Sequence, residues 1–244
     1  QSTQTSQITK SQAVALAGIQ SQMVLVDNST RTIEAHLTEK SIGDELLVEG
    51  SIIPSDLREI YHDIVKRRFE VYPNSDTVNE LNYNYPSYDW ATYHEYNCID
   101  IFPNLKLLFP YIKQCLDIAG DDYEDYYFKS WINVWPKGQK IIPHRHYGTW
   151  HGYYVVNDTG TTTYYTYKED GKNMVVPLKN FSGHFTFMPA HILHWADENP
   201  QDAMRISTGY NISTWEQIEE EDAANKNGRG GQVKNIITPL RDLI

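Results

Sequence analysis

The chain changes character at about residue 126, and from there to about residue 213 it consists of short segments rich in β-branched and aromatic residues. Turn-forming pairs such as Asp170-Gly171 and Ser182-Gly183 separate these segments, as in hairpin turns. Strands this short and evenly spaced, without helices alternating between them, favour a barrel or sandwich. The expected strands cover residues 127–135, 140–146, 151–156, 161–167, 174–177, 184–188 and 204–212.

Helices are expected to flank this β-rich region. Apolar residues recur at helical spacing over residues 55–69 and 105–119, and Pro110 is expected to kink the second helix. A C-terminal helix is expected over residues 214–225. Residues 72–96 are rich in Tyr, Asn and Pro, which is typical of a long ordered loop that forms a lid or a binding wall.

We therefore expect one main domain preceded by a short extension. Residues 1–12 are polar, 13–22 favour a short helix and 23–26 favour a strand. The expected division is residues 1–22 as polar arm and short helix, and residues 23–244 as a single domain, with helical support over about 50–120, a barrel core over about 127–213, and a C-terminal helix and tail over 214–244.

Composition excludes some classes of function. The formal net charge of −11 makes a nucleic-acid partner unlikely, because sequence-independent binding of nucleic acid requires a basic surface. The two cysteines do not form a disulfide framework, so we expect reduced thiols. The sequence contains no run of about 18 apolar residues and no signal-peptide core, so we expect no membrane partner and a cytoplasmic location. Oligomeric state stays open.

Three histidines suggest a metal site. His144 and His146 are two residues apart, and in a strand such residues point to the same face with α-carbons roughly 7 Å apart. His194, on a later strand, would complete a three-ligand face, and imidazole is a good ligand for iron, copper, nickel and zinc. The alternative is that the three histidines are unrelated, each hydrogen-bonded in the core or exposed to solvent.

The residues around these histidines resemble the two motifs of the cupin superfamily. The family's first motif is Gly, five residues, His-x-His and then Glu, and its second is Gly, five residues, Pro-x-Gly, two residues and His. This chain departs from the pattern at His151, which occupies the Glu position, and at His191, which replaces the last Gly. The resemblance implies a mainly β fold, a double-stranded β-helix (jelly-roll) barrel with flanking α-helices from the N-terminal half. The residues in register are Gly138, His144, His146, Gly183, Pro189 and His194.

Arg205 and Ser207 indicate which group within this superfamily the chain resembles most. They follow His194 by 11 and 13 residues and alternate onto one face of a strand. A guanidinium and a hydroxyl are suited to bind the far carboxylate of a dicarboxylic co-substrate. Over about residues 127–213 the chain is similar to uncharacterised iron(II)/2-oxoglutarate-dependent dioxygenases. That similarity implies Fe(II), 2-oxoglutarate as co-substrate, and hydroxylation of a small molecule or a peptide side chain. Alternatively, Arg205 simply pairs with an acid at the barrel rim.

His146 stands where that family usually has a carboxylate ligand. Three interpretations follow. Three neutral imidazoles hold Fe(II), which is the interpretation we favour; or His146 swings away and water or halide takes its place; or the metal is Zn, Ni or Mn. The last would make the protein a cupin-type metalloenzyme that does not use 2-oxoglutarate, either a three-histidine dioxygenase or an isomerase. A non-catalytic β-barrel binding protein is a further alternative.

Several neighbouring residues are weaker candidates for the site. Asn133 and Tyr154 would donate hydrogen bonds to the co-substrate if they face inward, or are ordinary strand residues. His151 is either a ligand or ligand partner, or an exposed turn residue, and His191 is more plausibly a partner or core residue than a ligand. Trp150 and Trp195 lie near the expected metal in sequence, and either contact substrate or pack the barrel.

Overall fold

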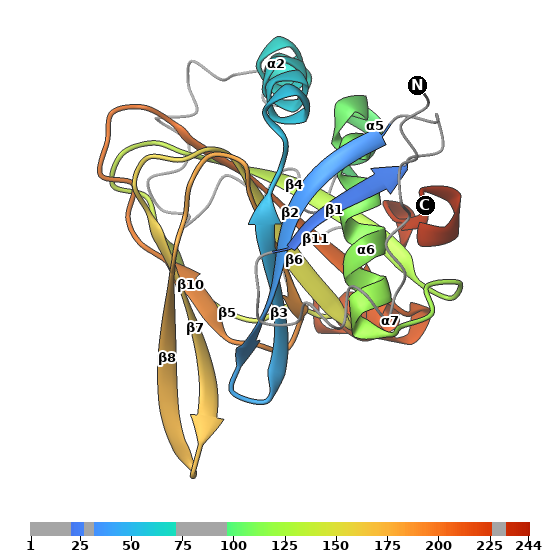
Figure 1. Ribbon diagram of the computed structural model, residues 1–244, viewed down its shortest axis with the longest axis vertical. Helices are drawn as coiled ribbons and strands as arrows, with labels where there is room; N and C mark the ends of the chain where they lie inside the picture. Colours follow the sequence, from blue (N-terminus) through green and yellow to red (C-terminus); the bar gives the residue numbers. More distant parts are fainter. Residues whose placement is uncertain (1–20, 27–31, 72–96, 226–232) are drawn as a thin grey trace, which may run out of the picture.

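The computed structural model describes residues 21–26, 32–71, 97–225 and 233–244, and within these it forms two antiparallel sheets (Figure 1). The larger, eight-stranded sheet has the order β1-β2-β3-β9-β6-β11-β4-β12 and the smaller has the order β5-β10-β7-β8. The strands of the larger sheet are, in that order, Ser21–Val26, Thr32–Ile42, Glu45–Ser51, His184–Pro189, Trp150–Asn157, Arg205–Ser213, Tyr127–Trp135 and Thr238–Pro239. Those of the smaller are Ile141–His144, His194–Ala196, Thr162–Glu169 and Lys172–Lys179.

The strands expected over residues 127–212 are present, and the mainly β, jelly-roll architecture expected from sequence is confirmed. The N-terminal half differs from expectation, because it supplies strands as well as helices. β2 and β3 form a hairpin around Gly43, whose φ of 62° suits a tight turn, and β3 pairs with β9 to extend the larger sheet. Ser21 and Gln22, expected at the end of a helix, instead begin β1. The arm and the rest of that helix, together with the 72–96 loop, lie outside the described residues.

The helices are α2 (Pro54–Val71), α5 (Cys98–Ile101), α6 (Phe109–Ala119) and α7 (Trp215–Asn225), with short 3-10 turns at 103–108, 233–235 and 240–242. The expected kink at Pro110 is absent, because α6 begins at Phe109. Pro110 therefore lies in the first turn, where its missing N–H costs no helical hydrogen bond. Among the described helices, none is both long and apolar enough to cross a membrane.

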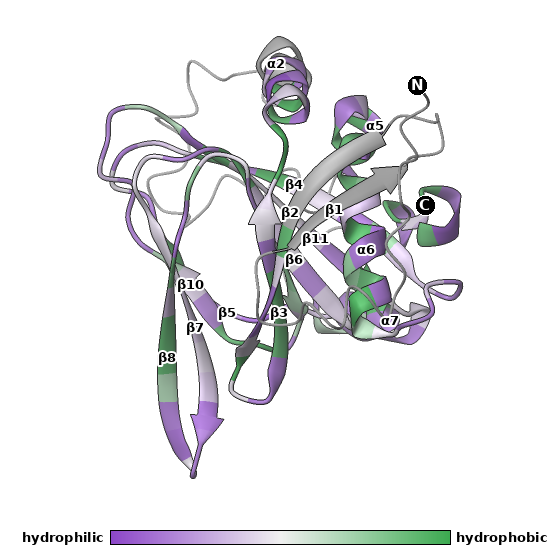
Figure 2. Ribbon diagram, in the orientation of Figure 1, coloured by the Kyte–Doolittle hydropathy of each residue, from purple (hydrophilic) through white to green (hydrophobic). Residues whose placement is uncertain are grey.

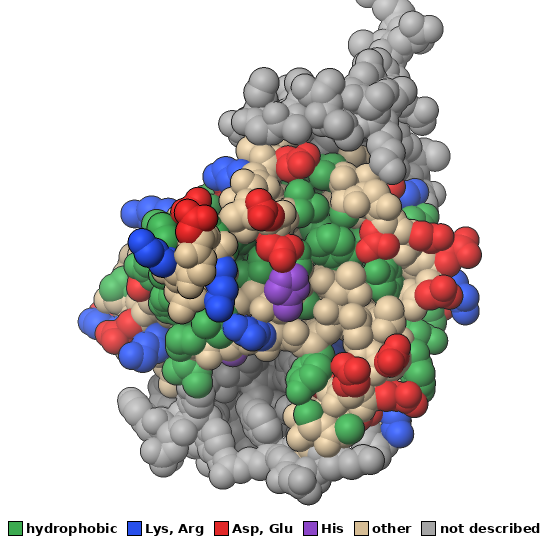
Figure 3. All heavy atoms as spheres, turned by 90° about the horizontal axis from the view of Figure 1, so that it is seen from below, with side chains coloured by type: hydrophobic (Ala, Val, Ile, Leu, Met, Phe, Trp, Pro, Cys, Tyr) green, Lys and Arg blue, Asp and Glu red, His purple; other side chains and the backbone are tan. Residues whose placement is uncertain are grey.

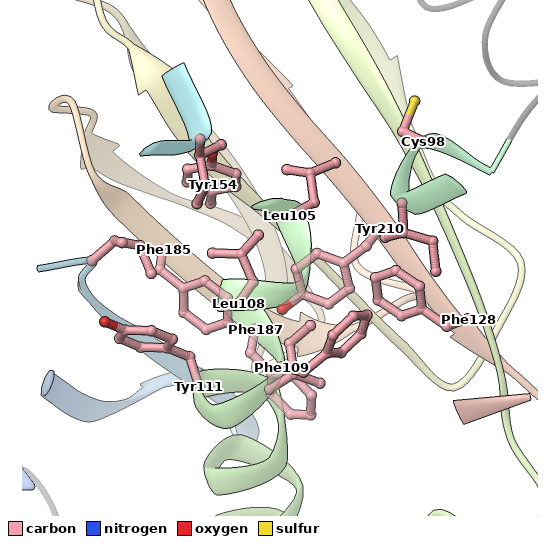
Figure 4. Close-up of a cluster of buried hydrophobic side chains, with 14 of the residues drawn as sticks. Cys98, Leu105, Leu108, Phe109, Tyr111, Phe128, Tyr154, Phe185, Phe187 and Tyr210 are labelled. Carbon is pink, nitrogen blue, oxygen red and sulfur yellow. The ribbon is translucent and has the colours of Figure 1, made fainter. Parts of the chain in front are cut away.

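Alternation along β4, β6 and β11 gives the larger sheet two different faces. One face packs against α5 and α6, which cover the side of the sheet away from the smaller sheet (Figure 1). Its buried side chains include Phe128, Tyr154 and Tyr210 (Figure 4). The ring of Phe128 packs against Phe109 of α6, with 4.9 Å between centroids, and stacks on Tyr210 at 5.8 Å. Hydrophobic and hydrophilic residues mix along α6, as expected for a helix with one buried side (Figure 2). The other face of the sheet is turned toward the smaller sheet.

Gly209 on β11 allows Trp131 of β4 to lie close across the strand. A Cβ atom at position 209 would come within 2.5 Å of two ring carbons of Trp131. We expect Gly209→Ala to lower the free energy of unfolding by about 1–3 kcal/mol, because the buried indole must shift. Urea unfolding measures this loss. The loss should shrink when Trp131 is Leu, and an equal loss in both backgrounds would contradict the explanation.

Candidate metal centre

Two neighbouring strands of the smaller sheet bring the three predicted histidines together. His144 on β5 is the direct register partner of His194 on β10. His146 lies just beyond β5, where its backbone N–H donates to the carbonyl of Ala190 (3.1 Å) and so anchors it beside the turn between β9 and β10. One ring nitrogen from each of the three side chains lies within 4.8 Å of the other two, close enough for all three to reach one cation.

Hydrogen bonds from the rings of His144 and His194 leave one nitrogen of each ring available to bind a metal. Nδ1–H of His144 donates to the carbonyl of Ile142 (2.8 Å), and Nδ1–H of His194 donates to the carbonyl of Ile192 (3.0 Å). These bonds leave the Nε2 lone pairs as ligands, as is usual for metal-bound histidine. The Nε2 atom of His146 is buried and has no hydrogen-bond partner among the described residues. The donor set therefore fits a divalent transition metal, and a swung-away His146 is not the arrangement seen.

Burial keeps these imidazoles neutral. It lowers the pKa of His144 and brings the pKa values of His146 and His194 well below the usual 6.5, with repulsion from neighbouring histidines adding to the effect. His151 has a pKa of about 3, again mainly because of burial. Neutral imidazole is the form that binds metal, so protons compete little at neutral pH.

The same shifts predict acid sensitivity of the metal-free protein. Between the ordinary pKa of 6.5 and the lowered values (about 3 for His151), the unfolded chain binds more protons than the folded chain. The free energy of unfolding should therefore be highest above about pH 6.5 and fall as the pH drops, by up to ~1.4 kcal/mol per pH unit for each such group. Urea unfolding from about pH 7.5 to 4.5 measures this slope, which should be shallower in His151→Phe. A flat profile would contradict the burial of the neutral rings.

His151 on β6 is buried beside the cluster rather than exposed at a turn. Its ring stacks on His146 with 3.7 Å between centroids and 10° between planes, and its Nδ1 lies 3.0 Å from Oδ1 of Asn211. Trp131 stacks on His146 at 5.4 Å. His151 is not in the group of three whose nitrogens converge. It forms a wall that restricts the orientation of His146.

Arg205 and Ser207 of β11 are buried in the same region. Arg205 is 2% exposed, its Nε donates to Thr161 Oγ1 (2.9 Å), its Nη1 donates to Ser207 Oγ (3.0 Å), and its guanidinium lies 4.5 Å from the ring centroid of Trp135. Burial lowers the pKa of Arg205, yet a guanidinium remains charged in proteins. Among the described residues, no carboxylate lies within ion-pair distance of it. The nearby charge of Asp158 favours the guanidinium, and Thr161, which accepts from Arg205, donates to Asp158 Oδ1 (2.9 Å). A buried cation without a paired anion is a favourable site for an anionic ligand.

One cavity of about 270 Å³ connects the histidine cluster with Arg205. It lies between the two sheets, since β4, β6 and β11 line one side and β5, β7 and β10 line the other. Asn133, the register partner of Ser207, lines the cavity, and its buried Oδ1 has no hydrogen-bond partner among the described residues. Trp195 also lines it and stacks on Tyr164 at 5.5 Å.

Tyr153 lines the cavity, whereas the structure places Tyr154 in the hydrophobic core against the helices. Adjacent strand residues face opposite sides, so Tyr153 shares a face with His151 and Tyr154 does not. Counting by two from His151 would have found Tyr153. The same alternation turns Trp150 away from the cavity, where its Nε1–H donates to Asp121 Oδ2 (2.6 Å).

His191 is also outside the cavity. Its side chain is 66% exposed and its Nε2 lies 2.8 Å from Oε1 of Glu45. Figure 3 shows a histidine exposed among acidic and basic side chains on the face viewed from below. Position 191 lies in the tight turn directly after β9, and this turn directs its side chain to the surface instead of toward His194.

No family model matches the sequence, and no curated protein matches it significantly. Among solved structures, AviO1 from Streptomyces viridochromogenes Tue57 is similar, with a TM-score of 0.50 and 10% identity over 69% of this chain and 90% of that chain. The non-heme alpha ketoglutarate dependent epimerase SnoN from nogalamycin biosynthesis has a TM-score of 0.42 and 15% identity over 66% of this chain and 84% of that chain. A Pseudomonas putida prolyl-4-hydroxylase has a TM-score of 0.46 and 10% identity over 71% and 90%. The likeness to AviO1 concerns the fold, and the expectation of a cupin-like double-stranded β-helix is confirmed.

Proposed function

We propose that the protein is a non-haem iron(II), 2-oxoglutarate-dependent dioxygenase that hydroxylates a substrate still to be identified. The observation that carries this proposal is one cavity containing both three converging imidazoles and a buried guanidinium without a carboxylate partner among the described residues. When bound, iron would supply the oxidative chemistry, in which 2-oxoglutarate, dioxygen and a substrate C–H group give succinate, carbon dioxide and a C–OH group.

The chain's own residues would bind and orient the co-substrate. His144, His146 and His194 would hold Fe(II), and Arg205 with Ser207 would bind the far carboxylate of 2-oxoglutarate. Asn133 has an unpartnered amide oxygen facing the same cavity and would orient either the co-substrate or an ordered water. A site with three neutral ligands carries one more positive charge than a site with two histidines and a carboxylate. The dianionic co-substrate would offset this charge.

The cavity walls limit what the substrate can be. Trp131 and Trp195 make part of the wall aromatic, and a cavity of about 270 Å³ suits a small molecule or one side chain of a peptide. The net charge of −11 disfavours nucleic acid as the substrate. Aromatic walls also exclude water from the reacting groups.

A second candidate is a cupin-type metalloenzyme that does not use 2-oxoglutarate. The observation that favours it is His146, since three neutral imidazoles also suit Zn, Ni or Mn. This candidate predicts activity without co-substrate and no effect of substitutions at Arg205.

The test is turnover of 2-oxoglutarate by protein loaded anaerobically with Fe(II) and then exposed to air. Enzymes of the proposed class should form succinate in an iron-dependent and Arg205-dependent manner, even when the substrate is unknown and turnover is slow. Metal-loaded protein that consumes no 2-oxoglutarate, with or without a library of small molecules and peptides, would contradict the proposal.

A further inference from the structure

A chain of hydrogen-bonded polar side chains runs from Glu49 on β3 to Arg205 in the cavity. It begins with Glu49 Oε2, which lies 2.9 Å from Nε2 of the fully buried His184. Lys40 contacts the other oxygen of Glu49. Hydrogen bonds from His184 and Lys40 favour the carboxylate, and the pKa of Glu49 is lowered even though burial acts in the opposite direction. Neither Glu49 nor His184 lines the cavity or belongs to the histidine cluster.

Asn180 connects His184 to two parts of the site through hydrogen bonds. Its Oδ1 lies 3.3 Å from Nδ1 of His184 and accepts a hydrogen bond from the Tyr153 hydroxyl (2.9 Å). Its Nδ2 donates to Thr161 Oγ1 and Thr163 Oγ1, both at 3.0 Å. Tyr153 and Thr163 both line the cavity.

The Asp158 carboxylate can only accept hydrogen bonds, and this determines which group donates and which accepts along the series from Arg205 to His184. The Thr161 hydroxyl donates to Asp158 Oδ1 (2.9 Å), so it must accept from both Arg205 Nε and Asn180 Nδ2. The amide of Asn180 therefore points its oxygen toward Nδ1 of His184. Both ring nitrogens of His184 then face oxygen acceptors, Asn180 Oδ1 and Glu49 Oε2, so the ring donates to both as an imidazolium beside the Glu49 carboxylate. Exchanging the amide's two ends would place its oxygen against Thr161 Oγ1, whose one proton is donated to Asp158, and would break that bond.

We propose that His184 is a positioning residue for the anion-binding end of the cavity, because it fixes the amide of Asn180. That amide orients the Tyr153 hydroxyl and holds Thr161 in place to accept from Arg205. With Nε and Nη1 of Arg205 held by Thr161 and Ser207, its Nη2 has no acceptor among the described side chains and is left for the ligand. The inference rests on the proposed function, since the ligand would be the far carboxylate of 2-oxoglutarate.

Variants at position 184 test this role separately from folding. In His184→Gln the amide reaches toward Glu49 but loses the donor to Asn180, whereas in His184→Asn the amide nitrogen lies near the position of Nδ1. Glu49→Gln is a second, isosteric variant at a partly exposed site, and it removes the negative charge that the His184 ring faces. His191→Gln is the matched control, because it alters a histidine–glutamate pair of similar length (2.8 Å) that is exposed and outside the chain of hydrogen bonds.

The readout is the dissociation constant of two ligands for protein loaded anaerobically with Fe(II). 2-Oxoglutarate has the far carboxylate, and pyruvate keeps the 2-oxo acid group but lacks it. We expect His184→Gln to weaken 2-oxoglutarate binding about 10-fold, as is typical for loss of a partner that orients a binding residue, with pyruvate and iron binding unchanged. His184→Asn should recover most of the affinity, Glu49→Gln should show a smaller loss, and His191→Gln should match wild type. Unchanged 2-oxoglutarate binding in His184→Gln, or an equal loss for pyruvate, would overturn the inference.

Failure of the proposed function would look different, because wild-type protein would then not bind 2-oxoglutarate. The exchange rate of the Arg205 Nε–H with solvent, measured by NMR in the ligand-free protein, then decides the role of His184. Faster exchange in His184→Gln than in wild type supports the positioning role, and an unchanged rate overturns it.

Discussion

Replacing Arg205 with methionine is expected to weaken binding of 2-oxoglutarate by about 100-fold, or ~2.7 kcal/mol, with iron binding retained. The guanidinium is buried, held at two nitrogens, and unpaired with any carboxylate of the described residues, so a bound carboxylate would be its counter-charge. Methionine fills a similar volume but cannot donate a hydrogen bond. Arg205→Lys should also lose most of the affinity, because a lysine cannot reproduce the bonds from Nε and Nη1 or the close contact of the guanidinium with the Trp135 ring.

Isothermal titration of the Fe(II)-loaded protein with 2-oxoglutarate under anaerobic conditions measures this loss. Arg145→Met is the matched control, since Arg145 lines the same cavity but is exposed, and it should change the affinity by no more than about threefold. Equal losses in both variants would mean that the cavity attracts anions only through its overall charge. Retained affinity in Arg205→Met would remove Arg205 from the binding site.

Replacing His194 with alanine is expected to weaken metal binding by roughly 100- to 1,000-fold, because it removes one of the three protein ligands. In structural zinc sites, four protein ligands together contribute ~10–16 kcal/mol, which corresponds to about 2.5–4 kcal/mol for each ligand. His194 is the central member of the cluster in the fold, since β10 lies between β5 and β7 and His194 pairs directly with His144. Succinate formation should be lost together with the metal. Metal analysis after gel filtration, followed by competition with a chelator, gives the stoichiometry and the affinity.

The variant His151→Ala tests whether His151 is a metal ligand or only stacks on one. His151 stacks on His146 but does not converge with the other three, so its loss should cost only about 10-fold in metal affinity. If His151→Ala lost the metal as completely as His194→Ala, then His151 would be a ligand. If His194→Ala kept one equivalent of iron with wild-type affinity, the cluster would not be the metal site.

Patterns of residue type along the sequence predicted the parts of the fold that depend on residues close together in the sequence. The strands over residues 127–213 follow from turn pairs and β-branched residues, and the convergence of His144 with His194 follows from the spacing of two motifs. The hairpin of β2 and β3 escaped prediction, because charged and polar residues interrupt its apolar alternation and its stability depends on pairing with β9. β10 is three residues long, too short to show any periodicity.

Within the site, the sequence could predict which residues share a face but not what each one touches. Alternation from His151 identifies Tyr153 as facing the cavity, so the expectation for Tyr154 could have been corrected from the sequence itself. The contacts that hold Arg205 could not have been found in this way. Thr161 is 44 residues away from it, and Glu49 is 135 residues away from His184. Such bonds depend on how the sheets pack, which local spacing does not encode.

Anaerobic titration of the metal-free protein with Fe(II), with and without 2-oxoglutarate, tests the central claim most directly. The three imidazoles and Arg205 line one cavity, so iron and co-substrate should bind together and give the visible metal-to-ligand charge-transfer band of an iron(II)–2-oxo acid complex. We expect the band to saturate at one equivalent of iron, to require 2-oxoglutarate, and to be absent in His194→Ala. Iron that binds at one equivalent without any 2-oxoglutarate-dependent band would contradict the account.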